Sequence, residues 1–265
     1  VESKIQLGIE TTRGLGAGMN PDIGKESAEE SREAITNAIK DSDMLFITAG
    51  FGGGTGTGAS PVIASIAKEL EILTVGIVTK PFNYEGDLRS QQAEAGIRKL
   101  EQHVDSLIVI PNEKLKSLGK TITVMGGFEA ANNVLLNSVQ GIVELITVPG
   151  VINLDFADVK AVMSDKGRGI MGSALASGPD RGKQAIDEAV NSPLLEDINL
   201  EGAKGILLNV TSGKDLEISE LEEIGSIVKS YASKEAKVIV GTSISKEIND
   251  SIRVTVVATG LGEKD

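Results

Sequence analysis

The stretch that decides the fold runs from Met44 to Gly58 and reads Met-Leu-Phe-Ile-Thr-Ala-Gly-Phe-Gly-Gly-Gly-Thr-Gly-Thr-Gly. Met44–Thr48 is a short continuous apolar run, which predicts a β-strand buried on both faces. A helix is predicted from about Ala59 to Leu70. Between them lies a glycine-rich loop of Gly52, Gly53, Gly54, Thr55, Gly56, Thr57 and Gly58. Backbone N–H groups left accessible by glycine, next to the start of a helix, can bind a phosphate chain. A tight turn without a ligand would need only one or two glycines, so the number of glycines favours phosphate binding.

Strands and helices alternate on both sides of this loop. Helices are predicted over 25–41, 59–70 and 88–103, and strands over 44–48, 73–79 and 106–110. Continuous apolar strands that alternate with helices predict an α/β fold with an open, mainly parallel sheet. Parallel strands place their carboxyl ends at one edge, where such sheets bind ligands. The glycine-rich loop is therefore expected at that edge.

A long helix is predicted next, because apolar residues recur every three or four positions until Pro149-Gly150. These residues are Phe128, Ala131, Leu135, Val139, Ile142 and Ile146. Strands predicted over 170–177, 205–210, 238–242 and 252–258, with helices over 182–191 and 217–231, indicate a second α/β domain with a mixed sheet. We expect a nucleotide-binding domain over 1–126, a central helix over 127–150 and a second domain over 151–265.

Composition excludes several classes of function. The 265 residues include 26 Lys and Arg against 38 Asp and Glu, a net charge of −12 that repels nucleic acid and anionic lipid. The absence of Cys excludes disulfide frameworks, thiolate metal sites and cysteine nucleophiles. No apolar run approaches the roughly 18 to 20 residues that span a bilayer, and no signal peptide opens the chain. We expect a soluble, cytoplasmic protein with no nucleic-acid partner and no direct membrane insertion.

Two pairs of polar residues have two interpretations each. Glu85 and Arg89 lie four apart at a helix start, so they either hold a ribose and its base or form a surface ion pair worth a few tenths of a kcal/mol. Asp155 and Asp158 either cap a helix or orient a water for attack, and the residues alone favour capping. The single histidine, His103, is predicted to be a solvated side chain near a helix end.

A dinucleotide cofactor is an alternative ligand. Gly54-x-Gly56-x-x-Ala59 matches the loose dinucleotide fingerprint, but Thr79-Lys80 stands where an acidic residue is expected to bind the ribose. NAD is thus disfavoured, and NADP stays open because of Lys80. An NADP-dependent oxidoreductase and a non-hydrolysing scaffold fragment are the two competing functions.

The glycine-rich loop, together with Thr79–Gly86, Val104–Asn112 and Asn153–Asp158, resembles the FtsZ family of bacterial cell-division GTPases in the tubulin superfamily. The resemblance covers nearly the whole chain. It implies a GTPase that binds GTP or GDP with Mg²⁺ and assembles head to tail with copies of itself into filaments of the division ring. In relatives, a carboxy-terminal tail binds division-machinery adaptors. That tail is missing here, as is the family's amino-terminal strand, glycine turn, helix and strand, so we expect these 265 residues alone to bind GTP poorly.

The resemblance also implies roles for individual residues. The loop would cradle the phosphates, with Ala17, Gly18 and Asn20 near the γ-phosphate. Contacts to the ribose and guanine would come from Glu85, Arg89, Asn112, Phe128 and Asn133. Many relatives carry Asp in place of Asn133, and Met125-Gly126-Gly127 replaces acidic neighbours expected before Phe128. Residues that complete the hydrolytic site of the neighbouring subunit would be Asn153, Asp155 and Asp158. This role raises the water-orienting interpretation above capping.

The length of the predicted central helix supports assembly independently of the resemblance. A central helix of about 20 residues spans roughly 30 Å. A general base must lie about 3 Å from its water, so carboxylates beyond the far end of that helix are expected to act on another copy's γ-phosphate. A head-to-tail contact that does not close builds a filament.

Overall fold

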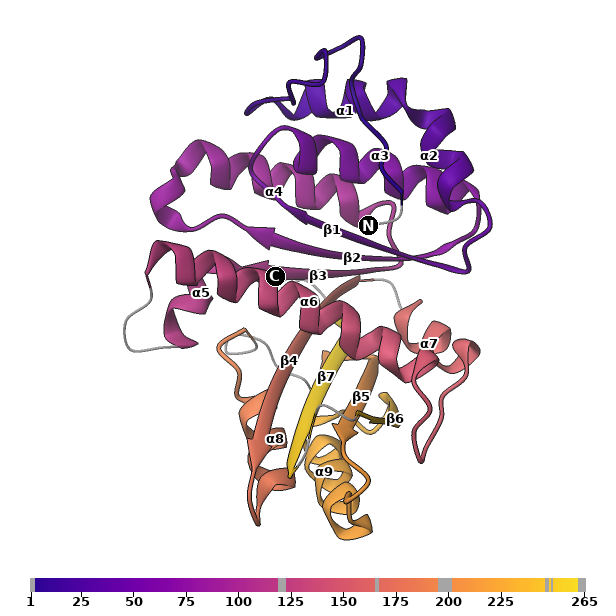
Figure 1. Ribbon diagram of the computed structural model, residues 1–265, viewed down its shortest axis with the longest axis vertical. Coiled ribbons are helices and arrows are strands. Elements are labelled where there is room, and N and C mark those ends of the chain that lie inside the picture. The colour runs from indigo at the N-terminus through magenta and orange to yellow at the C-terminus, as the bar shows by residue number, and fades with distance from the viewer. Residues whose placement is uncertain are drawn as a thin grey trace. The chain divides into compact units, whose positions relative to one another are not determined.

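The computed structural model describes residues 3–118, 123–164, 167–194, 202–245, 248 and 250–261. The chain divides into two compact units, Val1–Lys116 and Ser117–Asp265, which are described separately. The elements of each unit are labelled in Figure 1.

The first unit contains a parallel sheet of β1 (Met44–Gly50), β2 (Leu73–Lys80) and β3 (Ser106–Pro111), in that order. Their register aligns the carboxyl ends, with Gly50 beside Thr79 and Lys80 beside Pro111. The predicted parallel sheet is confirmed. The segments that follow β1, β2 and β3 therefore begin at the same edge.

The predicted burial of the first strand on both faces is wrong. Within the described residues β1 pairs with β2 alone, and of its seven residues only Ile47 is buried. By contrast, Leu73–Thr79 of β2 are all buried, because β2 has a neighbour on each side. An apolar run predicts a strand, but its burial depends on what pairs with it.

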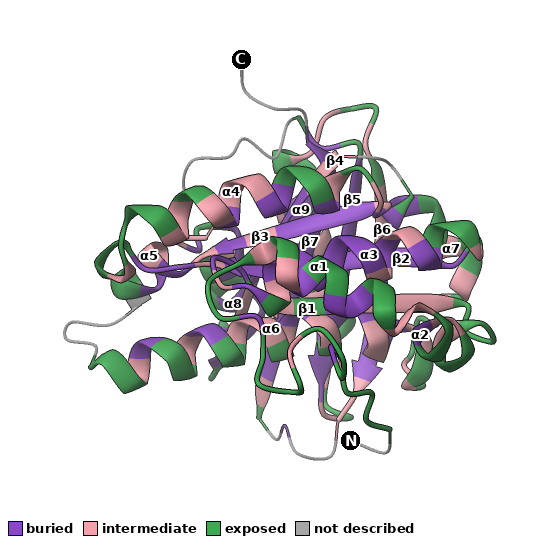
Figure 2. Cartoon of the chain, turned by 90° about the horizontal axis from the view of Figure 1, so that it is seen from above, coloured by how far each residue is buried: buried purple, intermediate pink, exposed green. Residues whose placement is uncertain are grey.

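The helices of the first unit are α1 (Pro21–Glu30), α2 (Arg32–Ile39), α3 (Thr55–Glu69), α4 (Asp87–Glu101) and α5 (Asn112–Leu115), with 3₁₀ turns at Asn83–Glu85 and Lys116–Leu118. α3 packs against the strands and is buried over much of its length, whereas α1 and α2 expose more residues (Figure 2). Two apolar clusters hold these layers together. One joins Ile47, Val78 and Leu107 to Ile97 and Leu100 of α4, and the other joins α1 and α2 to Val62 and Ile66 of α3.

The helix predicted over 25–41 is two helices. Pro21 occupies the first turn of α1, where its missing N–H costs nothing, and Asn20 caps it, so α1 begins four residues earlier than predicted. At Ser31 the backbone leaves helical geometry, with ψ at 12°, and α2 starts afresh. Ala28 and Ile35 are nevertheless buried, as predicted.

The second unit contains α6 (Val124–Thr147), α7 (Phe156–Met163), β4 (Gly167–Ser177), α8 (Arg181–Val190), β5 (Gly205–Ser212), α9 (Ile218–Tyr231), β6 (Lys237–Ile244) and β7 (Ser251–Leu261). Its strands lie in the order β4-β7-β5-β6, with β7 antiparallel to both neighbours and β5 parallel to β6. The predicted mixed sheet is confirmed.

The predicted central helix corresponds to α6, which has 24 residues. It begins before Phe128, because the Thr123 Oγ1 accepts the N–H of Gly126 at 3.0 Å and caps the helix. Asn209 of β5 anchors α6 to the sheet by donating from Nδ2 to the Gly141 carbonyl at 3.0 Å. Among the helices described, none is long and apolar enough to cross a membrane.

Arg181 joins three segments at one end of the second unit. Its Nε donates to Glu220 Oε1 at 2.8 Å and its Nη1 to Asp215 Oδ2 at 2.5 Å. The Arg181 side chain is 9% exposed and that of Glu220 14%. The hydrogen bonds from Arg181 lower the pKa of Glu220 and the pKa of Asp215 below their usual values.

These lowered pKa values predict a pH-dependent stability. A carboxyl with a depressed folded pKa stabilises the fold above its unfolded pKa, and the contribution is lost as the pH falls through the folded pKa. Replacing Arg181 with methionine should lower the free energy of unfolding at pH 7 by about 2 kcal/mol, because Glu220 keeps a buried charge without its partner. The difference from the unmodified protein should shrink below about pH 4.

Urea unfolding at pH 7 and pH 3 measures this effect. The matched control is Lys183→Met, which removes an exposed charge from the same helix. Equal effects of the two substitutions at both pH values would contradict the role of Arg181.

Candidate functional site

The glycine-rich loop leaves the sheet at the end of β1 and is fastened at two points. The Gly52 N–H donates to the buried Thr57 Oγ1 at 2.9 Å, while Gly52 itself has φ of +104°. The Gly54 N–H donates to the Gly18 carbonyl at 2.8 Å. The loop is thus held from the α3 side and from the segment that precedes α1.

Four glycines of the loop are explained by the fold itself. A Cβ on Gly54 would lie 2.7 Å from the Ala17 carbonyl oxygen, one on Gly56 would lie 2.7 Å from that of Gly50, and one on Gly58 would lie 2.0 Å from that of Pro21. Gly52 needs its positive φ. Gly53 differs, because the nearest atom to its Cβ position is Arg89 Nη2 at 3.9 Å. The fold leaves the space beside Gly53 for something else.

Helix α3 begins inside this loop, four residues before the predicted start. Its N-cap residue is Gly54, which has no side chain to accept a hydrogen bond, and its first turn has no acidic residue. Within the described structure the N–H groups of Thr55, Gly56 and Thr57 have no acceptor. These free donors and the positive end of the helix dipole have the chemistry to bind an anion.

The segment before α1 meets the loop as predicted, although its residues differ in what they do. The Ala17 N–H donates to Thr55 Oγ1 at 3.4 Å, and the Gly18 carbonyl holds Gly54. The Asn20 side chain instead accepts the Asp22 N–H at 3.0 Å and caps α1. Ala17 and Gly18 therefore adjoin the loop through the backbone.

Glu85 and Arg89 form an ion pair of 2.5 Å after β2. Glu85 is fixed further because its Oε1 accepts the Phe82 N–H at 3.0 Å. The Arg89 Nη2 approaches Gly53, so this pair borders the glycine-rich loop. The predicted ion pair is therefore present, with the Arg89 side chain 38% and the Glu85 side chain 12% exposed. The role of the pair in holding a ribose and its base stays a prediction.

Two buried polar atoms near this edge lack partners. Arg89 Nε and Asn112 Oδ1 are buried with no hydrogen bond, and Asn112 follows β3 directly. Buried polar atoms are nearly always paired with protein or water, so a ligand or water molecule at this edge would complete the hydrogen bonds that these two atoms lack among the described residues. Lys80, by contrast, forms an ion pair with Glu94 and is not free to bind a ribose phosphate.

Sequence reasoning missed Gln92 of α4. Its Nε2 donates to the Met19 carbonyl at 2.8 Å and so ties α4 to the segment that carries Ala17 and Gly18. Gln92 lies three residues after Arg89, on the same helix face, and this spacing was the available signal.

The remaining predicted residues lie in the second unit. Phe128 and Asn133 are exposed on α6. Asp155 and Asp158 form a capping box at the start of α7, in which Asp155 Oδ1 accepts the Asp158 N–H at 2.8 Å and Asp158 Oδ2 accepts the Asp155 N–H at 3.3 Å. Asn153 Oδ1 accepts the Gly150 N–H at 2.8 Å. The capping interpretation is thus confirmed, and each carboxylate keeps one oxygen that has no partner in the described residues.

Thr57 should matter for stability through its hydroxyl. Replacing it with valine leaves the buried Gly52 N–H without an acceptor, which should cost about 1–3 kcal/mol in the free energy of unfolding. Replacing it with serine keeps the acceptor and should restore most of that loss. Urea unfolding of both variants measures the difference, and equal losses would show that the methyl group matters instead.

Comparisons with known proteins identify the two parts of the chain. The model of the Tubulin/FtsZ family, GTPase domain, matches residues 1–120, and that of the FtsZ family, C-terminal domain, matches residues 167–262. Fold and site together define a tubulin-type GTPase domain that binds guanine nucleotide. The dinucleotide-dependent oxidoreductase is not favoured.

Relatives narrow the class further. Cell division protein FtsZ of Wigglesworthia glossinidia brevipalpis is 56% identical over 263 residues, which are 99% of this chain and 68% of that protein. The same protein of Coxiella burnetii is 55% identical over 97% of this chain and 67% of its own length. The chain belongs to the FtsZ family of cell-division GTPases.

Solved structures confirm the fold. An empty FtsZ dimer from M. jannaschii matches with a TM-score of 0.92 and 47% identity, over 96% of this chain and 74% of that one. A more distant protein, GDP-bound CetZ1 from Haloferax volcanii, matches with a TM-score of 0.82 at 21% identity, over 97% of this chain and 78% of its own, and so shows the shared fold alone.

Proposed function

We propose that the chain binds GTP at the carboxyl edge of β1–β3 and hydrolyses it within a head-to-tail filament of the division ring. The observation that carries this proposal is the uncapped start of α3, whose three free N–H groups adjoin the open space at Gly53. The loop would hold the β- and γ-phosphates by backbone donors, with Ala17 and Gly18 beside the γ-phosphate.

The ribose and base would lie along the polar groups that lack partners. Arg89 Nε is a free donor and Asn112 Oδ1 a free acceptor, and the Glu85 carboxylate holds the Arg89 side chain. Guanosine offers hydroxyl and N–H donors for Asn112 and acceptors for Arg89. Phe128 and Asn133, on the first turns of α6, would contact the base, Phe128 by stacking and Asn133 by a neutral amide.

Hydrolysis would proceed by in-line attack of water on the γ-phosphate. The free N–H groups of α3 would stabilise the charge that develops on the phosphate oxygens. In the described residues no group of three or more acidic or histidine side chains could hold a metal ion. A Mg²⁺ ion would neutralise phosphate charge when bound.

The residues that orient the attacking water would come from the next copy. Phe128 stands one turn inside α6, and the helix runs 19 residues further to Thr147, a span of about 30 Å. Asp155 and Asp158 follow beyond that end. If Phe128 contacts the base of a bound nucleotide, these carboxylates lie too far away to activate water at the same nucleotide, since general base catalysis requires about 3 Å. Asp155 Oδ2 and Asp158 Oδ1 are the free oxygens for this role, with Asn153 beside them.

Calorimetric titration with GTP, GDP and NADPH tests the ligand. We expect saturable but weak binding of both guanine nucleotides to these 265 residues, as the sequence predicts, and no binding of NADPH. Binding of NADPH in preference to GTP would overturn the proposal, as would the absence of any guanine-nucleotide binding at millimolar concentration.

Turnover measured against protein concentration tests the assembly requirement. GTP hydrolysis per subunit should rise steeply above a threshold at which light scattering also rises. Turnover per subunit that stays constant on dilution below this threshold would contradict the shared active site. Recruitment to the division site and binding of adaptors through a tail are further parts of the proposed function, and fluorescent fusions to the protein would show them.

A further inference from the structure

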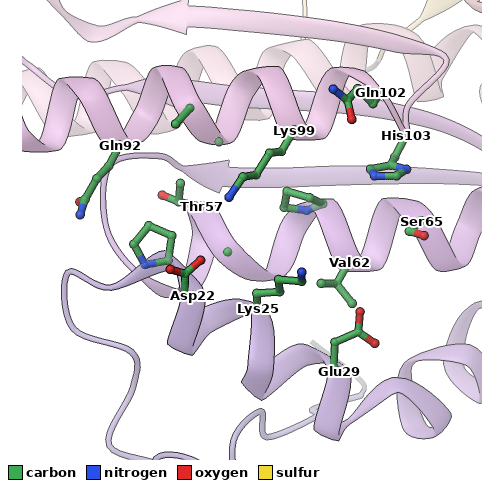
Figure 3. Close-up of a pocket in the computed structure, with 15 residues that line it drawn as sticks. Asp22, Lys25, Glu29, Thr57, Val62, Ser65, Gln92, Lys99, Gln102 and His103 are labelled. Atoms are coloured by element: carbon green, nitrogen blue, oxygen red, sulfur yellow. The ribbon is translucent and has the colours of Figure 1, made fainter.

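A cavity of about 460 Å³ lies in the first unit, between α1, α3 and α4 (Figure 3). One wall is formed by Asp22, Lys25 and Glu29 of α1. The opposite wall is formed by Gln92, Lys99, Gln102 and His103 of α4 and the turn after it. The floor is a face of α3 that includes Gly58 and Pro61.

Lys25 and Lys99 extend into this space from opposite walls (Figure 3). Neither has an ion pair or a side-chain hydrogen bond within the described residues. The chain has 38 acidic against 26 basic residues, so partners for lysine are plentiful elsewhere. Lys80, for example, is paired with Glu94. Lys25 and Lys99 are both exposed residues. Two cationic groups that face one cavity repel each other, and an anion bound between them would stabilise the arrangement.

The acidic residues of the cavity do not supply that anion. Glu29 is engaged with Arg32 at 3.1 Å on the side of α2. Asp22 stands in the first turn of α1, where the helix dipole favours a carboxylate, and it forms no ion pair with either lysine in the described structure. The lining therefore carries two lysines that have no ion pair within the described residues and two carboxylates, of which Glu29 is paired with Arg32.

Neutral groups complete the lining. His103 is half-buried, and not the solvated side chain that the sequence predicted. Burial, followed by the charge of Lys68, lowers the pKa of His103, so its ring is a neutral hydrogen-bonding group near pH 7. At the other end, the buried Gln92 Oε1 accepts no hydrogen bond. A hydroxyl or N–H on a ligand would satisfy this acceptor.

We propose that this cavity binds a small organic dianion, a phosphate ester or a dicarboxylate, whose charged oxygens lie between Lys25 and Lys99. The floor includes Thr57 and Gly58, which belong to the glycine-rich loop as well. A bound anion would thus also contact α3. This site is separate from the proposed nucleotide site and does not depend on it.

The imidazole of His103 provides a probe, because it is the only histidine in the chain. Its ring C–H signals in a proton NMR spectrum are unique, so they report on this cavity alone. Sodium sulfate serves as the tetrahedral probe and sodium succinate as the dicarboxylate probe, each at an ionic strength kept constant with sodium chloride. We expect a saturable shift of the His103 signals and a rise in the pKa of His103, because a nearby anion favours the imidazolium form.

Lys25→Gln and Lys99→Gln should each weaken the binding by at least tenfold. The matched control is Lys40→Gln, which removes the same charge at the end of α2, outside the cavity, where Lys40 Nζ donates to Asn37 Oδ1 at 3.3 Å. It should leave the titration unchanged. Tighter binding of sulfate would identify a phosphate ester as the ligand class, and tighter binding of succinate a dicarboxylate.

A shift that does not saturate, or that the two cavity variants leave unchanged, would mean an adventitious ion only and would overturn the proposal. Thermal unfolding of each variant verifies that it is folded. Because the readout needs no nucleotide, a failure of GTP binding would leave this result intact.

Discussion

Replacing Asp158 with asparagine is expected to lower GTP turnover per subunit by at least about 100-fold, because a positioned general base contributes that much or more. GTP affinity and filament formation should persist, since Asp158 is proposed to act on the nucleotide of another copy. Asparagine keeps a side-chain oxygen that can accept the Asp155 N–H, so the capping box at α7 is largely preserved. Phosphate release, nucleotide binding and sedimentation measure the three properties.

The capping role of the same residues requires its own control. Asp155→Ser keeps an oxygen that can accept the Asp158 N–H at the N-cap but removes the carboxylate, so it should also lose turnover while its unfolding midpoint changes by only a few degrees. If both variants hydrolyse GTP normally, the carboxylates serve only to cap α7. If both unfold, the loss of turnover reports stability instead.

A mixing experiment separates a shared site from a site within one copy. Asp158→Asn is mixed with a second variant, Gly54→Val. The valine side chain would clash with the Ala17 and Gly18 carbonyls and disable the glycine-rich loop. Each variant alone should be inactive. In an equal mixture about a quarter of the head-to-tail contacts would join the intact loop of one variant to the intact Asp158 of the other, so activity should return in part. A mixture as inactive as its components would contradict the shared site.

Much of this fold follows from local sequence, and the differences have physical causes. The apolar run 73–79 forms a strand whose residues are all buried, because β2 pairs with β1 on one side and β3 on the other. The run 106–110 also forms a strand, in which Val109 is only half-buried. The same kind of run at 44–48 also forms a strand, but its burial depends on pairing that the run itself cannot specify. The single helix predicted over 25–41 is interrupted at Ser31, and no proline or glycine in the sequence indicates this break between α1 and α2.

The site was predictable in its chemistry and less so in its geometry. Glycines are poor helix formers, so the pattern placed the start of α3 after the loop. Tertiary contacts override that preference, because Gly56 and Gly58 pack against the carbonyls of Gly50 and Pro21. Spacing alone could not decide between an ion pair and a binding role for Glu85 and Arg89. The unpaired Nε of Arg89 and its approach to Gly53 depend on how α4 packs beside the loop.

Gly58→Ala and Gly53→Ala should have opposite effects, although both add one methyl group to the same loop. At Gly58 the new Cβ would lie 2.0 Å from the Pro21 carbonyl oxygen and 2.7 Å from the Lys25 nitrogen, both backbone atoms of α1. Relief requires α1 and α3 to separate, so we expect the free energy of unfolding to fall by about 2–3 kcal/mol. At Gly53 the nearest atom is 3.9 Å away and φ is not positive, so stability should change by less than about 0.5 kcal/mol.

The effect of Gly53→Ala should instead appear in the affinity for nucleotide. The space beside Gly53 is the one that the proposal assigns to a phosphate, so its methyl group should weaken GTP binding by at least about tenfold, or 1.4 kcal/mol. Urea unfolding and calorimetric titration of the same two proteins measure both quantities. GTP binding by Gly53→Ala at unchanged affinity would show that the open space is not the phosphate site. If Gly53→Ala lost as much stability as Gly58→Ala, glycine at position 53 would be needed for packing, and the expectation drawn from its open surroundings would be wrong.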